Sequence, residues 1–115
     1  MRSSCLDCAR KHCSAALVLE MEVKQGYPLH GWIVVGHLNE AADELITEYP
    51  ALAERIRSER IEYMAGLNRC LKMNNEGEFH VEGELYDLPL IEIITDITLQ
   101  HISEVEELKD QSSDD

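Results

Sequence analysis

Two cysteines and a histidine near the start of the chain are spaced so that they could bind one metal ion. Cys5, Cys8 and His12 follow one another at intervals of three and four residues, so on a helix their side chains fall within an arc of about 60°. Zinc prefers thiolate sulfur and imidazole nitrogen, and a C-x2-C pair at a helix start is also typical of a redox-active dithiol. The spacing therefore indicates a zinc site or a redox site.

A second helix, predicted from Leu29 to about Glu48, carries polar groups on a face that should be buried. This face spans an arc of about 140° and mixes histidines and carboxylates with apolar residues. Its members are His30, Ile33, Val34, His37, Glu40, Ala41, Glu44 and Leu45. Because a buried carboxylate must be paired or must coordinate an ion, we expect this face to supply ligands. We expect His30 to line the turn that precedes the helix.

The connection between these two helices predicts which side chains meet. Gly26-Tyr27-Pro28 should end the first helix, predicted from about Ser4 to Gln25, and produce a short antiparallel hairpin. If the turn is centred there, Cys8 faces Ile46, His12 faces Ala42, and Glu44 lies between the two levels.

We therefore predict a zinc site built from Cys5, Cys8, His12 and Glu44, in which His37 or Glu40 replaces Glu44 if the helices cross steeply. Two other interpretations stay open. The cysteines can instead form a redox dithiol, or they can be core residues without a cofactor, with His12 paired to Glu44 or Glu40.

The spacing Cys5-x2-Cys8-x3-His12 resembles the active-site motif of alkyl hydroperoxidase D-like and carboxymuconolactone decarboxylase-like helical proteins. That resemblance implies Cys8 as the peroxidatic thiol, Cys5 as its partner and His12 as a proton relay. Proteins of that family carry helices and an acidic relay residue before the motif, whereas four residues precede Cys5 in this sequence. The resemblance therefore concerns the chemistry of the motif and not the fold of the chain.

Two further resemblances involve the second helix. Glu40-Ala-Ala-Asp43 is similar to the E-x2-D element with which MazG-type nucleotide pyrophosphohydrolases bind magnesium, but the paired E-x2-E element is absent, and Glu92 and Asp96 are one residue too far apart to fit the pattern. The N-terminal C-x2-C-x3-H together with Gly36-His37-Leu38-Asn39-Glu40-Ala41 also resembles small phage and prokaryotic proteins. That likeness implies no particular activity.

The remaining pattern predicts a mainly α fold, an up-down four-helix bundle with a small β-hairpin between helices three and four. The third helix is expected from Pro50 to about Met73, and the hairpin over 79–86 with its turn at Glu82-Gly83. The fourth is expected from Asp87, as N-cap, for about 20 residues. We expect one domain over residues 1–109 and a flexible acidic tail over 110–115.

Composition excludes some functions. The formal charge of −13, from 23 acidic and 10 basic residues, is unsuited to binding nucleic-acid phosphates directly. No signal peptide or apolar run long enough for a membrane helix is evident, which favours a reducing cytoplasm. There, Cys13 and Cys70 are expected to be buried small hydrophobic residues.

Together these observations predict a zinc-binding regulatory module, phage-encoded, that engages a basic or DNA-binding protein partner. Binding is favoured over catalysis; the alternatives are the thiol redox enzyme and the pyrophosphohydrolase-like bundle. Trp32 and Met64, expected on outer helical faces, suggest homo-oligomerisation.

Overall fold

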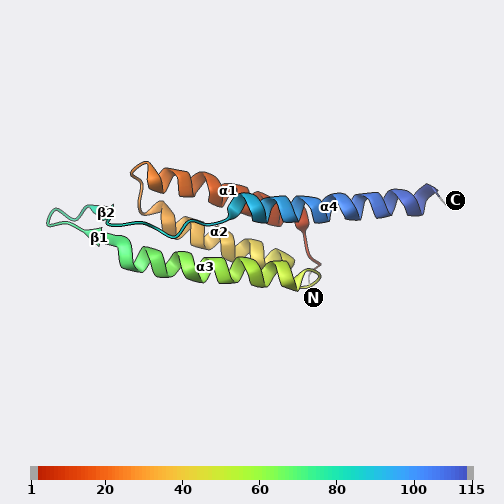
Figure 1. Ribbon diagram of the computed structural model, residues 1–115, viewed down its shortest axis with the longest axis horizontal. Helices are drawn as coiled ribbons and strands as arrows, with labels where there is room; N and C mark the ends of the chain where they lie inside the picture. The colour runs from red at the N-terminus through yellow and green to blue at the C-terminus, as the bar shows by residue number, and fades with distance from the viewer. Residues whose placement is uncertain (1–2, 114–115) are drawn as a thin grey trace.

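A computed structural model describes residues 3–113, and their side chains as far as Lys109. It contains four helices and a small hairpin between the third and fourth, in agreement with the predicted fold class. In chain order the elements are α1 (Leu6–Lys24), α2 (His30–Leu45), α3 (Pro50–Cys70), β1 (Leu71–Met73), β2 (Phe79–Val81) and α4 (Leu90–Ser113). Figure 1 shows α1, α2 and α3 running back and forth, with α4 beside α1 and in the direction of α2.

The core lies where α2 packs between α1 and α3, and α4 adds residues from the side of α1. Its largest fully buried side chains include Tyr63, Leu38, Leu45 and Ile56. Helix α1 contributes one face to this core. Its buried residues are Ala9, Cys13, Ala16, Glu20 and Val23, so Cys8 and His12 lie beside the buried face and not at its centre. Cys13 and Cys70 are buried free thiols, as predicted.

The connection between α1 and α2 contains Gly26, whose φ of +114° is unfavourable for residues with a Cβ. His30 lines this turn, as expected: its Nδ1 lies 2.8 Å from Glu22 Oε2 and its ring stacks on Tyr27. Pro50 occupies the first turn of α3, where its missing N–H costs nothing.

The β-hairpin forms earlier in the chain than predicted. Strand β1 pairs antiparallel with β2, with Leu71 opposite Val81 and Met73 opposite Phe79, so the prediction of a turn at Glu82-Gly83 was wrong. The turn is instead made by Asn74, whose Oδ1 accepts hydrogen bonds from the N–H groups of Glu76 and Glu78. Helix α3 accordingly ends at Cys70, before the predicted Met73.

An extended segment over 82–89 returns from the hairpin along the bundle to the start of α4 (Figure 1). Helix α4 begins at Leu90, after the predicted N-cap Asp87, and continues past the expected boundary at residue 109. It contributes Leu90, Ile93 and Ile97 to the core. The molecule is elongated as a result, with extents of 70 × 26 × 18 Å. Within the described residues, no helix is long and apolar enough to cross a membrane.

Candidate metal centre

The two cysteines of the C-x2-C motif lie where the start of α1 meets the end of α2. Cys5 is the N-cap of α1, and its Sγ accepts the N–H of Cys8 at 3.1 Å. The backbone N–H of Cys5 donates to the carbonyl of Glu44 at 2.9 Å. Ser4 and Glu48 exchange two further hydrogen bonds. These contacts hold the motif against the last turn of α2.

Cys5 and Cys8 form a disulfide in this structure. The sulfur atoms occupy the first turn of α1, where the helix dipole and the free N–H groups stabilise a thiolate once the bond is reduced. Cys13 differs from them in this respect. Cys13 is fully buried, and this burial raises the pKa of its thiol to about 12, so it remains protonated and unreactive.

Glu44 supplies the third group of the cluster. One ligand atom each from Cys5, Cys8 and Glu44 lies within 4.8 Å of the others. The Glu44 side chain is only 8% exposed, which is uncommon for a carboxylate without a specific role. The predicted convergence of these three residues is therefore present, and among the described residues they form the one such group of potential metal ligands.

The two predicted histidines meet each other instead of the sulfur atoms. His12 on α1 and His37 on α2 approach with their Nδ1 atoms 3.0 Å apart and their ring centroids 5.3 Å apart. One Nδ1 must carry a proton and the other must accept it. Burial and the neighbouring His12 lower the pKa of His37, against an opposing effect of Glu40. Neither imidazole belongs to the group around Glu44.

Glu40, the last of the six predicted ligands, is exposed and acts on His37 only through its charge. Of the six predicted ligands, the two cysteines and Glu44 converge, the two histidines pair with each other one helical turn further along α1, and Glu40 lies on the surface. The interpretation without a cofactor, in which His12 pairs with Glu44 or Glu40, does not describe the contact either, because the partner of His12 is His37.

The offset between α1 and α2 explains which residues of the two helices meet. Glu44 faces Cys5 and His37 faces His12, whereas a symmetric hairpin would place Ala42 opposite His12. Helix α2 is therefore shifted by about five residues, or about 7 Å at the helical rise per residue. This shift places Glu44 opposite Cys5, instead of between the levels of Cys8 and His12, and it brings His37 to the level of His12.

Of the four carboxylates that suggested a magnesium site, all but Glu40 are held by arginines. Asp43 lies 3.4 Å from Arg57, and Arg55 on α3 contacts both Glu92 and Asp96 on α4. These pairs connect neighbouring helices, and they do not gather Asp43 with Glu92 and Asp96.

A buried carboxyl group that sequence reasoning missed is Glu20. It lies on the buried face of α1 with Ala16 and Val23, and its Oε2 accepts the N–H of Leu88 at 3.2 Å. Its spacing of four residues from Ala16 was the available signal.

No protein-family model, curated protein or solved structure matches this chain. The fold and the site define a mainly helical protein with a disulfide and a buried carboxylate at one helix junction. The resemblances of the individual motifs stay predictions.

Proposed function

We propose that this protein is a small metal-binding module, in which the reduced thiols of Cys5 and Cys8 and the carboxylate of Glu44 hold one zinc ion. The observation that carries this proposal is the convergence of two sulfur atoms and a buried carboxylate oxygen within 4.8 Å. Thiolate and carboxylate are both zinc ligands, and four-coordinate zinc leaves a further position for water or a fourth side chain.

The donor set fits zinc only in one redox state. The disulfide must take up two electrons and two protons to give two thiols, which lose their protons when they bind the ion. A reducing cytoplasm supplies the electrons through its thiol pool. An ion bound there would join the start of α1 to the end of α2, the junction that the Ser4 and Glu48 hydrogen bonds already hold. This role suits a binding module better than an enzyme.

Metal titration of the reduced protein tests the proposal. Under anaerobic conditions with a phosphine reductant, Co²⁺ should bind with one-to-one stoichiometry and show thiolate-to-metal charge-transfer absorption, and Zn²⁺ should displace it. The double variant Cys5→Ser, Cys8→Ser should lose this signal, and Glu44→Gln should weaken binding by about tenfold or more, because outer-shell substitutions alone cost that much. Cys13→Ser is the matched control, because it removes a thiol outside the cluster. An unchanged titration in the double variant, or a metal-free reduced protein, would contradict the proposal.

A thiol–disulfide oxidoreductase is the second candidate, and the Cys5–Cys8 disulfide favours it. In such a reaction one thiolate attacks a substrate disulfide and releases one substrate thiolate. The second cysteine then attacks the mixed disulfide, releases the other substrate thiol and leaves the Cys5–Cys8 disulfide. Glu44 beside both sulfur atoms is placed to accept the thiol proton.

Reduction of insulin disulfides with dithiothreitol as electron donor separates the two candidates. An oxidoreductase should accelerate the reaction, the double cysteine variant should not, and Glu44→Gln should lower the rate constant. A rate equal to that of the double variant would exclude this activity for the protein disulfide tested and leave the metal site as the function of the cluster.

A further inference from the structure

The second half of α4 carries apolar side chains that the rest of the chain does not cover. After Ile97, no residue of α4 is buried as far as Lys109, the last described side chain. Glu104 marks the end of the bundle, because its Oε1 accepts a hydrogen bond from Tyr49, which directly precedes α3. Figure 1 shows α4 continuing beyond the loop between α2 and α3.

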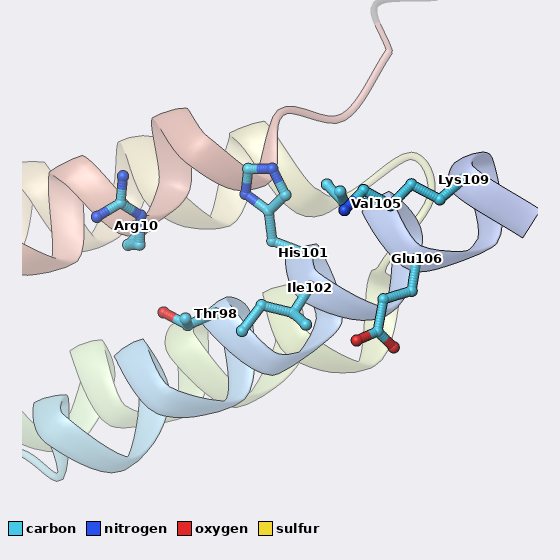
Figure 2. A pocket seen from close by; sticks show the side chains of 7 residues that line it. All are labelled: Arg10, Thr98, His101, Ile102, Val105, Glu106 and Lys109. Carbon is cyan, nitrogen blue, oxygen red and sulfur yellow. The ribbon is translucent and has the colours of Figure 1, made fainter.

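A groove of about 460 Å³ runs along this part of α4, beside the start of α1. Its lining residues are Arg10, Thr98, His101, Ile102, Val105, Glu106 and Lys109. Figure 2 shows that Arg10 comes from α1 and that the other six side chains project from successive turns of α4. The apolar members are well exposed, Ile102 at 49% and Val105 at 44%.

The groove is long enough to contact a helix. Its α4 residues from Thr98 to Lys109 span about 16 Å along the helix axis, at about 1.5 Å per residue. Its two apolar side chains, Ile102 and Val105, are three residues apart, a spacing that an amphipathic partner helix can contact. A compact small molecule would fill only part of this length.

The charge around the groove indicates which kind of partner helix would bind there. The lining contains Glu106 beside Lys109 and Arg10, of which Arg10 is paired with Asp7; Glu107 lies on the same stretch of α4, and the whole chain carries −13. Two copies of so acidic a chain repel each other, so self-association through this surface is disfavoured. A basic partner is instead attracted to the surface before contact and paired with carboxylates around the apolar strip after contact.

We propose that the groove between α1 and α4 binds a basic amphipathic helix of a partner protein. This inference rests on the proposed role as a binding module, and it names that module's surface. It is independent of the metal, because the cysteine cluster lies between α1 and α2.

A designed peptide tests the surface. The probe is a helix of about 18 residues with leucines every three or four positions and lysines elsewhere; a scrambled peptide of equal charge has no apolar stripe. The designed peptide should bind one-to-one in a fluorescence anisotropy titration, more tightly than the scrambled one. Its affinity should fall as salt is raised from about 0.05 to 0.5 M, because screening weakens the charge attraction.

Matched substitutions locate the contact. Ile102→Asp and Val105→Asp should each weaken binding of the designed peptide by about tenfold or more, as expected for a central apolar contact. Ile61→Asp, on α3 and 58% exposed, adds the same charge and should leave binding unchanged. Since each variant makes the protein more acidic, a loss at the groove cannot come from weaker charge attraction.

Several results would overturn the inference. Equal affinity for both peptides, or an equal effect of Ile61→Asp, would reduce the interaction to net charge. A dimer in sedimentation that Val105→Asp dissociates would make a second copy the occupant. The double cysteine variant should bind the peptide as the parent protein does, so a failure of the metal proposal is distinguishable from a failure of this one.

Discussion

Glu20 combines burial with a titratable charge, and its environment determines how stability depends on pH. The side chain is 4% exposed, and burial raises its pKa from 4.5 more than the hydrogen bond from Leu88 lowers it. The folded state thus holds this proton more tightly than the unfolded state. Glu20 therefore stabilises the fold most below its unfolded pKa of 4.5, and this contribution is lost as the pH rises through the folded pKa.

Glu20→Gln should accordingly make the fold more resistant to heat at pH 8 and give no gain at pH 4. The amide oxygen can still accept the N–H of Leu88, while the buried negative charge is removed. Thermal unfolding followed by circular dichroism at the two pH values measures the difference. An equal change of melting temperature at both values would mean that charge burial is not the cause.

The hydroxyl of Tyr63 is buried, and in the described part of the structure it has no hydrogen-bond partner. Burial, with a smaller effect of Glu20, raises its pKa to about 12. Removing a buried polar group that makes no bond should help folding, so we expect Tyr63→Phe to stabilise by about 1 kcal/mol in urea unfolding.

Tyr86→Phe is the control for this substitution, because the hydroxyl of Tyr86 donates to Glu59 Oε2 at 2.5 Å. It should destabilise by about 1 kcal/mol, the usual net value of one hydrogen bond. If both substitutions act in the same direction, a change in packing outweighs the hydroxyl in one of them.

At the scale of elements, the helices could be predicted from the sequence, but the offset between them could not. The arc shared by Cys5, Cys8 and His12 follows from the angle per residue, which is a local property. Which residue of α2 faces His12 depends on how far the turn folds back along α1, and that is decided by packing. The predicted convergence is therefore present for Glu44 and the two cysteines and absent for His12, which pairs with His37.

The misplaced β-hairpin has a similar cause. Glu82-Gly83 and Asn74 to Gly77 both contain a glycine with positive φ, so both are acceptable turns by composition. The side chain of Asn74 bonds two backbone N–H groups across its turn, which favours that site. A rule that weighs asparagine capping would have selected it.

Helix packing around Gly31 gives an element-scale prediction. A Cβ at Gly31 would lie 2.6 Å from Leu67 Cδ2, a fully buried side chain of α3. Gly31→Ala should therefore destabilise by about 1 to 3 kcal/mol, the usual cost of overpacking, although alanine is the better helix former.

Gly36→Ala on the same helix is the matched control, because nothing lies within 4 Å of the added Cβ. It should stabilise by up to about 1 kcal/mol through helix propensity alone. Urea unfolding of both variants measures the contrast. A gain at Gly31 would show that Leu67 moves aside without cost and that α2 does not need a glycine there.

The whole molecule is longer than a symmetric bundle because α4 is displaced along the bundle axis. The extended segment over 82–89 returns along only part of the bundle before α4 starts. The second half of α4 therefore extends past the ends of the other helices (Figure 1). The core residues of α4, Leu90, Ile93 and Ile97, all belong to its first half. The core and the proposed binding surface therefore use different halves of one helix.

This division predicts the result of ending the chain after Gln100. The shortened protein keeps every buried residue of α4 and loses the hydrogen bond between Tyr49 and Glu104, so unfolding free energy should fall by only about 1 kcal/mol. The cysteine cluster is untouched, and Co²⁺ binding should be unchanged. Affinity for the basic amphipathic peptide should fall at least as far as in Val105→Asp, because the groove is removed together with Ile102. A large loss of thermal stability would instead assign the second half of α4 to the fold, and retained peptide affinity would place the binding surface elsewhere.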